Sequence, residues 1–183
     1  RKYMLQGKIA VITGASRGIG KAIAERFASA GAFVIINYNG SKEDAQEVKR
    51  EILEHGGNAE IMQCNVADFA ACETFIKQIV DRYGRIDVLV NNAGVEFNEL
   101  IGMISRANME KAFSVNVFGM IEMLQIVSRV MARNENGGSI INISSMVGLR
   151  GNAGQLVYSA TKGAVIALTK SAAKELAPKK IRV

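Results

Sequence analysis

Residues 8–20, which read KIAVITGASRGIG, decide the fold of this chain. The β-branched run at residues 8–13 is typical of a buried strand, and residues 20–30 are typical of a helix that ends at Gly31. Three glycines occupy the turn between them. Glycine lets the backbone turn sharply and approach a pyrophosphate, whose charge a helix N-terminus stabilises. A turn that needs glycines for geometry alone is the alternative, but the strand before it and the helix after it favour pyrophosphate binding.

Strands and helices alternate along the rest of the chain. Further strands are predicted at residues 33–37, 59–65, 86–91, 139–143 and 180–183, and further helices at residues 41–55, 68–83, 105–133 and 155–176. Ser41 with Asp44 is predicted to form a capping box, and Asp68 to cap the next helix. Six largely apolar strands separated by helices predict a doubly wound parallel α/β sheet, a Rossmann-like three-layer fold, in a single domain over residues 1–183.

Composition excludes several classes of protein. The chain has 183 residues and a formal charge of +6, but its basic residues are scattered among acids, and aromatics make up 6% with no Trp, which disfavours nucleic-acid binding. Two cysteines and one histidine cannot build a disulfide framework or a four-ligand zinc site. With no secretory segment at the start and no apolar run of about 18 to 20 residues, we expect a soluble cytoplasmic protein without a membrane span.

Loops at the carboxyl edge of the predicted sheet should hold the chemistry, because ligands bind there in open α/β sheets. The loop after residues 86–91 continues through Asn92, Ala93 and Gly94. Small residues there let the chain pass close to a bound nucleotide. The same residues are equally typical of an ordinary polar turn.

Tyr158 and Lys162 lie four residues apart in the last predicted helix, so both side chains project from one face. A phenol normally titrates near pH 10, and a neighbouring ammonium lowers its pKa toward the working range of an acid–base catalyst. A simple surface pair is the alternative. However, the preceding strand brings Ser144 and Ser145 to the same edge, where a hydroxyl is placed to hold a carbonyl oxygen that the tyrosine protonates. Asn116, set among apolar neighbours, is either part of this group or a satisfied structural amide.

Taken together, these motifs resemble the short-chain dehydrogenase/reductase family, in order along essentially the whole chain. Within the family, residues 14–20, residues 143–148 and the pattern Gly154-Gln155-x-x-Tyr158 are most similar to the bacterial 3-oxoacyl-acyl-carrier-protein reductase group. The family's chains usually continue past the sixth strand through a substrate-binding segment and a last strand. We therefore expect that segment and strand to be absent from these 183 residues.

The resemblance implies a role for each site residue. Tyr158 donates a proton to the carbonyl oxygen, Lys162 binds the nicotinamide ribose and lowers the tyrosine pKa, and Asn116 holds a water that feeds protons through the lysine. Ser145 binds the substrate oxygen; it stands 13 residues before the tyrosine, as in the family, whereas Ser144 should point away. The residues expected to bind the cofactor are Gly14, Ser16, Arg17, Gly18, Ile19, Gly20, Asn37, Asn65, Val66, Asn92, Ala93, Gly94, Tyr158 and Lys162.

NADP(H) is the expected cofactor. An NAD enzyme of this fold usually places Asp or Glu at the end of the second strand to accept from the ribose 2′-hydroxyl. Here that position is Asn37, and no carboxylate follows until Glu43. Arg17 in the glycine turn is suited to bind a 2′-phosphate.

The expected function is an NADPH-dependent ketoreductase acting on a 3-oxoacyl thioester in fatty acid synthesis. A carbonyl, alcohol or sugar dehydrogenase of the same family and a non-catalytic dinucleotide-binding module are the alternatives. An acidic acyl carrier protein is a candidate partner, and a set of basic residues is expected to bind it. One of them, Lys179, matches a carrier-docking position in the resembling reductases. The alternative is that these residues form a solvated basic face. The set is Arg129, Arg133, Lys174, Lys179 and Lys180.

Assembly into a homo-oligomer is expected through the helices at residues 105–133 and 155–176. The first is apolar over more than one stripe, with a second set of apolar residues expected to point away from the sheet. That set comprises Phe118, Ile121, Met123 and Val130. The resemblance implies a dimer that pairs these helices, and a tetramer of two such dimers.

Overall fold

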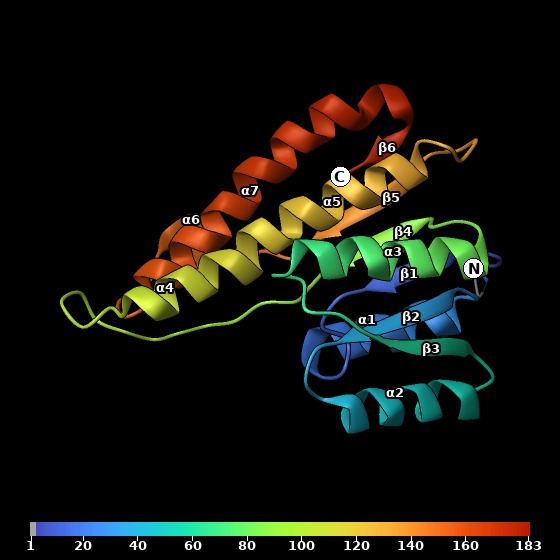
Figure 1. Cartoon of the computed structure of the whole chain (residues 1–183), viewed down its shortest axis with the longest axis horizontal. Coiled ribbons are helices and arrows are strands. Elements are labelled where there is room, and N and C mark those ends of the chain that lie inside the picture. The colour runs from blue at the N-terminus through green and yellow to red at the C-terminus, as the bar shows by residue number, and fades with distance from the viewer. Residues whose placement is uncertain (1–2) are drawn as a thin grey trace.

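The computed structural model describes residues 3–183, so residues 1 and 2 of the predicted domain lie outside the described residues (Figure 1). The elements, in chain order, are β1 (Ile9–Ile12), α1 (Gly18–Ser29), β2 (Phe33–Tyr38), α2 (Lys42–Glu54), β3 (Asn58–Gln63), α3 (Phe69–Tyr83), β4 (Val88–Asn91), α4 (Arg106–Phe113), η1 (Ser114–Phe118), α5 (Gly119–Met131), β5 (Gly138–Asn142), α6 (Val147–Arg150), α7 (Leu156–Leu176), η2 (Ala177–Lys179) and β6 (Ile181–Arg182).

All six strands form one parallel sheet in the order β3-β2-β1-β4-β5-β6. The predicted doubly wound α/β fold is therefore confirmed. The chain builds outward from β1 to β3 on one side and then restarts at β4 on the other side of β1. The connections after β1 and β4 consequently lead to helices on opposite faces of the sheet, and the crevice that this leaves at the carboxyl edge is where this fold binds ligands.

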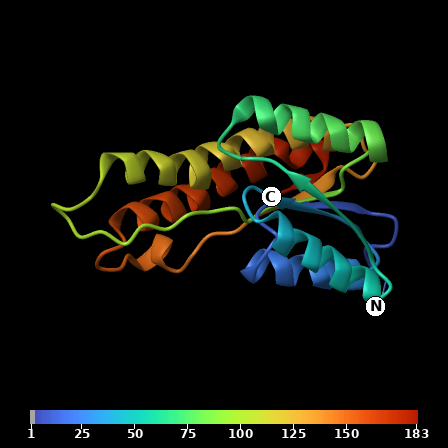
Figure 2. The same cartoon turned by 60° about the horizontal axis from the view of Figure 1, so that its bottom comes forward.

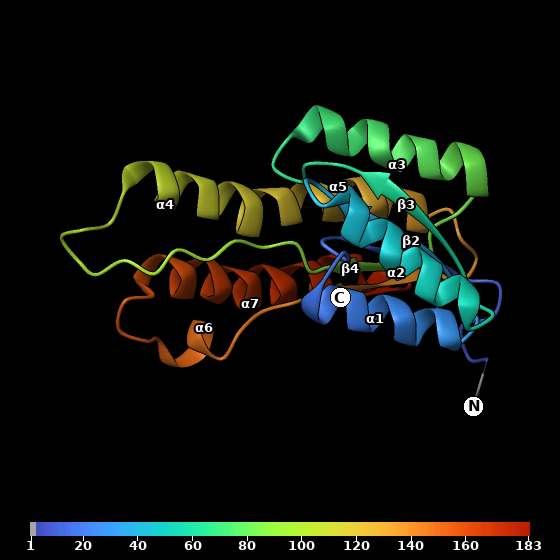
Figure 3. The same cartoon turned by 90° about the horizontal axis from the view of Figure 1, so that it is seen from below.

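Helices cover both faces of the sheet (Figures 2 and 3). On one face, α1 and α2 pack on the alternating apolar residues of β1 and β2, in a cluster that includes Ala24, Val48 and Ile36. On the other face, α3 and α5 enclose Val11 and Leu89. The cover on the α1–α2 face does not extend over β5, where Ile141 is 40% exposed.

The helix predicted at residues 105–133 is continuous through α4, η1 and α5, but five of its residues form a π-helix, η1. By length and composition alone, Arg106–Met131 could cross a membrane, so the expectation that no segment is long and apolar enough was wrong. Packing explains the composition: Met123, Val127 and Met131 are fully buried against α3 and the sheet. Met123 was thus wrongly expected to point away from the sheet, whereas Phe118 and Ile121 are exposed as predicted.

Only one of the two predicted helix caps forms. The Asp68 side chain accepts a hydrogen bond from the Ala71 N–H at 3.1 Å and so begins α3. Ser41 occupies the N-cap position of α2, but among the described residues its side chain makes no capping hydrogen bond, and the predicted box with Asp44 is not formed. The backbone of Ser41, with ψ of 65°, departs from the extended conformation that an N-cap side chain normally requires.

Candidate active site

The glycine turn after β1 is packed against the loop after β4. Gly14 has a φ of +59°, and a Cβ there would lie 2.9 Å from the Ala93 Cα. A Cβ on Gly20 would lie 2.4 Å from the Gly14 carbonyl oxygen. Gly18 also has a positive φ, of +58°, but its Cβ would meet no described atom within 4 Å. Gly14 and Gly20 are therefore needed for close packing, while Gly18 turns the chain at an open surface.

Thr13 joins these two loops and was not singled out from the sequence. Its hydroxyl accepts hydrogen bonds from the backbone N–H groups of Asn92 and Ala93, both at 2.9 Å, and the residue is 1% exposed. The Asn92 side-chain amide returns two bonds, to the Thr13 carbonyl at 3.2 Å and the Gly14 carbonyl at 3.0 Å. These contacts join residues that are far apart in the sequence. The only signal for them in the sequence is that both loops are predicted to lie at the same edge of the sheet.

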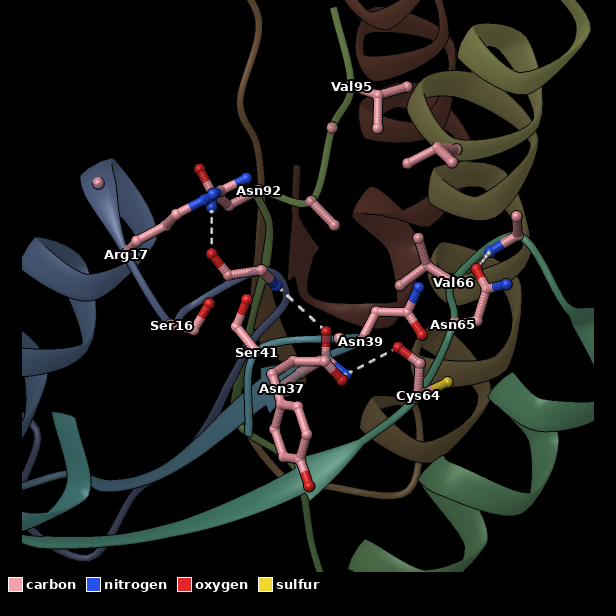
Figure 4. Close-up of a pocket in the computed structure, with 18 of the residues that line it drawn as sticks. Ser16, Arg17, Asn37, Asn39, Ser41, Cys64, Asn65, Val66, Asn92 and Val95 are labelled. Carbon is pink, nitrogen blue, oxygen red and sulfur yellow. Dashed lines mark hydrogen bonds between the residues drawn. The ribbon is translucent and has the colours of Figure 1, made fainter. Parts of the chain in front are cut away.

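Asn37 has a different place from the one expected. Its side chain is 1% exposed, its Oδ1 accepts from the Gly14 N–H at 3.1 Å, and its Nδ2 lies within hydrogen-bonding distance of the Tyr38, Met62 and Cys64 carbonyls at 3.2–3.4 Å (Figure 4). β2 continues to Tyr38, so Asn37 is not its last residue. Asn37 therefore holds the glycine turn through a buried hydrogen bond. The exposed polar side chain that follows β2 is that of Asn39, which lines the pocket described next.

An open pocket of about 610 Å³ extends along the carboxyl edge from the glycine turn to the end of β3 (Figure 4). Ser16, Arg17 and Gly18 line one wall, and Asn65 and Val66 line another. The remaining predicted cofactor residues that line it are Gly14, Ile19, Asn37, Asn92, Ala93 and Gly94. The fold thus brings all predicted cofactor residues except Gly20, Tyr158 and Lys162 together around one cavity, whose volume is in the usual range for a cofactor site.

The start of α1 faces this pocket with its positive end. Its N-cap residue is Arg17, the first turn carries no acidic residue, and within the described residues no side chain caps it. The first backbone N–H groups of a helix have no intrahelical acceptor, and the helix dipole adds positive potential there. Together with the open surface at Gly18, this arrangement fits a dinucleotide pyrophosphate.

A second, smaller pocket of about 290 Å³ adjoins the first and is lined by three of the four predicted catalytic residues, all but Asn116. Ser145, Tyr158 and Lys162 line it together with Ile143 and Glu96. Four residues line both pockets: Ile19, Asn92, Gly94 and Val95. A ligand extending from the first pocket into the second would therefore reach the Ser–Tyr–Lys group.

The two adjacent serines have different partners. The Ser144 hydroxyl donates to the Lys162 carbonyl at 2.9 Å, which fastens the loop after β5 to α7. The Ser145 hydroxyl lies at the pocket, where its interaction with the Tyr158 phenol lowers the pKa of that phenol. Both serines line the catalytic pocket, but only the Ser145 hydroxyl interacts with the Tyr158 phenol.

Burial sets the protonation of the tyrosine and the lysine. Burial raises the pKa of Tyr158, the Glu96 carboxylate raises it further, and Ser145 opposes both. This net direction is opposite to the lowering expected from Lys162. The Lys162 side chain is 4% exposed, and burial lowers its pKa. At neutral pH the Tyr158 phenol therefore carries its proton and is ready to act as an acid.

Asn116 lies in the π-helix η1 and is fully buried. Its Oδ1 accepts from the Val95 N–H and its Nδ2 donates to the Val95 carbonyl, both at 2.8 Å. A third bond runs from Nδ2 to the Thr161 hydroxyl at 3.2 Å. Both amide hydrogens are thus used within the chain, which matches the structural-amide alternative and fixes the loop after Gly94 to α7.

Glu96 is a charged, exposed residue at this pocket that was not predicted from the sequence. It lies two residues after Gly94, and its Oε1 accepts a hydrogen bond from the Gln155 side-chain amide. Gln155 also donates to Asn98 at 3.2 Å and accepts from Asn152 at 2.9 Å. The carboxylate is therefore held in place by a short polar network at the start of α7.

Comparison with known proteins shows the family of the chain. The sequence profile of the short chain dehydrogenase family matches residues 8–183. A 3-oxoacyl-acyl-carrier-protein reductase, FabG, of Staphylococcus aureus is 44% identical over 180 residues, which cover 98% of this chain and 73% of the relative. The corresponding reductase of a Synechocystis strain is 41% identical over 179 residues, covering 98% of this chain and 72% of the relative.

Solved structures share the same fold. A metagenomic short-chain oxidoreductase in complex with NADP has a TM-score of 0.93 at 37% identity, with 98% of this chain and 80% of that chain covered. An NAD⁺-bound xylitol dehydrogenase has a TM-score of 0.94 at 33% identity, covering 98% of this chain and 69% of that chain.

A parallel sheet with a glycine turn at its crevice defines a dinucleotide-binding protein, and the adjoining Ser–Tyr–Lys pocket defines an oxidoreductase. The chain belongs to the short-chain dehydrogenase family. The predicted family, fold and enzyme class are thereby confirmed.

Proposed function

We propose that this protein is an NADPH-dependent ketoreductase and that its substrate is a 3-oxoacyl thioester carried by an acyl carrier protein. The observation that supports this most directly is the convergence of Ser145, Tyr158 and Lys162 on one pocket that adjoins the glycine-turn pocket. A purely binding module has no need for a proton donor at that place.

The proposed roles follow from the positions of the side chains. The Ser145 hydroxyl holds the ketone oxygen, and the Tyr158 O–H donates the proton that converts this oxygen to a hydroxyl. When bound, NADPH supplies the hydride that is added to the carbonyl carbon. Lys162, which donates to the Ile143 carbonyl at 3.0 Å, is placed to bind the nicotinamide ribose, and Asn116 keeps the facing loop in position. Ketone, hydride and proton together give the secondary alcohol.

NADP(H) is preferred over NAD(H) because the adenine end of the pocket is cationic and lacks a carboxylate. Arg17 is exposed beside it, and residues 37–42 contain no Asp or Glu. A guanidinium binds a phosphate through two parallel hydrogen bonds, whereas the ribose hydroxyl of NAD needs an acceptor. The NADP complexes of two solved relatives at 37% identity support this assignment.

The substrate assignment is supported by relatives named 3-oxoacyl-acyl-carrier-protein reductases at 41–44% identity. A polyol or sugar dehydrogenase is the second candidate, because the chain is also 33% identical to a xylitol dehydrogenase and carries the polar residue Glu96, bound by Gln155, at the catalytic pocket. Both buried cysteines, Cys64 and Cys72, are free, in keeping with a reducing, cytoplasmic location.

Docking of an acyl carrier protein depends on assembly. The predicted basic residues are exposed, but they lie at the ends of α5 and α7 and in η2, at the edge of the sheet opposite the site. Lys179 follows Tyr158 by 21 residues, a span of roughly 30 Å at the rise of a helix. Antiparallel pairing of two copies along α5 and α7 would bring the basic end of one copy beside the other copy's site. Exposed Phe118 at the end of η1 and Ile121 on α5 supply apolar surface for such a dimer.

A panel of substrates tests the proposal. Purified protein is supplied with NADPH and, in separate reactions, a 3-oxoacyl thioester, a small ketone and a keto-sugar, while NADPH absorbance is followed. We expect the highest kcat/KM with the 3-oxoacyl thioester. A higher value with the keto-sugar would favour the second candidate, and no oxidation of NADPH with any ketone would favour a binding module.

A further inference from the structure

We propose that Glu96 is a positioning residue for the reaction: its carboxylate, fixed by Gln155 at the wall of the catalytic pocket, holds the proton on the Tyr158 phenol. The inference deepens the proposed function and rests on the role of Tyr158 as proton donor. It adds to that role a residue outside the Ser–Tyr–Lys group, contributed by the loop after β4 rather than by α7.

The position of Glu96 relative to α7 is fixed by the loop and by the helix. Glu96 and Tyr158 line the same pocket of about 290 Å³. The Gln155 amide, one helical turn before Tyr158, binds the carboxylate, and the Asn98 and Asn152 side chains in turn bind Gln155. A parallel bridge between Glu99 and Gln155 and a hydrogen bond from the Glu99 N–H to the Gly154 carbonyl at 2.9 Å fasten the same two segments. The loop thus holds the negative charge close to the start of α7.

The polar and charged groups around Tyr158 can be taken element by element. On α7 itself, the Lys162 ammonium lies 5.7 Å from the ring centroid, but burial lowers the pKa of this lysine. From the loop after β5, the uncharged Ser145 hydroxyl favours ionisation of the phenol, whereas from the loop after β4 the Glu96 charge disfavours it. Glu96 is exposed, but it lines the catalytic pocket. The charged residues on the neighbouring helices are exposed and do not line this pocket: Arg106, Glu110 and Lys111 on α4, and Arg150 on α6.

Glu96 therefore biases the direction of catalysis. A reduction requires the protonated phenol, and an alcohol oxidation requires the phenolate. A negative charge near a phenol makes the phenolate less stable, so it extends the protonated form to higher pH. Removing that charge should move the alkaline limit of ketone reduction to lower pH.

Titration of Tyr158 tests this directly. The tyrosinate absorbance of the wild-type protein is measured from pH 8.5 to 11, with circular dichroism verifying that it stays folded, and the titration of Tyr158→Phe is subtracted to isolate this one of the four tyrosines. The same pair of curves is taken in the Glu96→Gln background. We expect Glu96→Gln to lower the pKa of Tyr158 by about half a unit, a threefold change in ionisation constant. Glu96→Asp, which keeps the charge, should restore most of the wild-type value.

A matched control removes a carboxylate elsewhere. Glu110 is exposed on α4, where it pairs with Arg106 at 2.6 Å, so Glu110→Gln changes the net charge equally without touching the pocket. In the kinetic arm, the alkaline limb of kcat for ketone reduction should shift with Glu96→Gln but not with Glu110→Gln.

Two results would overturn the inference: an unchanged Tyr158 titration in Glu96→Gln, or a shift no larger than that of Glu110→Gln. A different pair of results separates the two proposals. If the wild-type protein reduces no ketone but the pKa of Tyr158 is still higher than in Glu96→Gln, the proposed function is contradicted and the electrostatic role of Glu96 is supported.

Discussion

The Lys162 ammonium lies 5.7 Å from the centroid of the Tyr158 ring, one helical turn away on the same face of α7. The lysine also donates to the Ile143 carbonyl at the end of β5, so helix and sheet edge are joined at the catalytic pocket. Both side chains are pre-positioned by packing. Their protonation, however, is governed mainly by burial, which favours the neutral form of each.

Asn37 should be a stability determinant rather than a cofactor-selecting residue. Its Nδ2 donates toward backbone carbonyls, and an aspartate there would place a negative charge against them with no hydrogen to donate. We expect Asn37→Asp to lower the free energy of unfolding by at least about 2 kcal/mol, measured by urea denaturation. Asn39→Asp, at the exposed mouth of the same pocket, is the control and should change it by less than about 0.5 kcal/mol. Equal stability of the two variants would contradict this assignment.

Thr13 should be essential to the junction of the two loops. Thr13→Val keeps the shape of the side chain but leaves the Asn92 and Ala93 N–H groups without their acceptor. We expect a loss of about 1–3 kcal/mol in the free energy of unfolding, together with weaker NADPH binding in a fluorescence titration. The control, Thr74→Val on the exposed side of α3, should show neither effect. A Thr13→Val protein with wild-type stability and affinity would show that the hydroxyl is dispensable.

Arg17 should carry the preference for NADP(H). With the guanidinium removed, Arg17→Ala is expected to lose about tenfold or more in kcat/KM with NADPH while changing little with NADH, because only NADPH carries the 2′-phosphate. The ratio of the two kcat/KM values checks this. Comparable efficiency of the wild-type enzyme with both cofactors, or an unchanged ratio in Arg17→Ala, would argue against the assignment.

Phe118 at the end of η1 and Ile121 on α5 should lie in a dimer interface. Sedimentation of the protein at micromolar concentration should give a dimer, and Phe118→Glu with Ile121→Glu should give a monomer.

In the dimer, KM for a carrier-linked substrate should rise with ionic strength and with Lys179→Glu, while KM for a carrier-free thioester stays constant. A wild-type monomer, or equal salt dependence for both substrates, would count against this arrangement.

Local patterns were sufficient for most of the fold. Glycines at 14, 18 and 20 between a β-branched run and an apolar helix indicated the turn, and alternation of short strands with longer helices indicated the parallel sheet. The π-helix at Ser114–Phe118 and the short α6 left no readable pattern, because both depend on how the chain packs at the site.

Contacts between distant segments were the part that could not be read from the sequence. Asn37 was placed at a strand end because the pattern alone did not show that β2 continues to Tyr38 and that the carbonyls of β3 surround the amide. Glu96 was missed because its partner, Gln155, is 59 residues away. Tyr158 and Lys162 were found because helical spacing is a local property, whereas the direction of the pKa of Tyr158 depends on burial.

Steady-state reduction of a 3-oxoacyl thioester by the wild-type protein and Tyr158→Phe is the most direct test of the central claim, that this phenol protonates a ketone oxygen. NADPH oxidation is followed at neutral pH, and NADPH affinity is measured separately for both proteins. We expect Tyr158→Phe to lose about 10²- to 10⁴-fold in kcat while binding NADPH as the wild type does. Turnover by Tyr158→Phe within a few-fold of the wild-type rate would contradict the account.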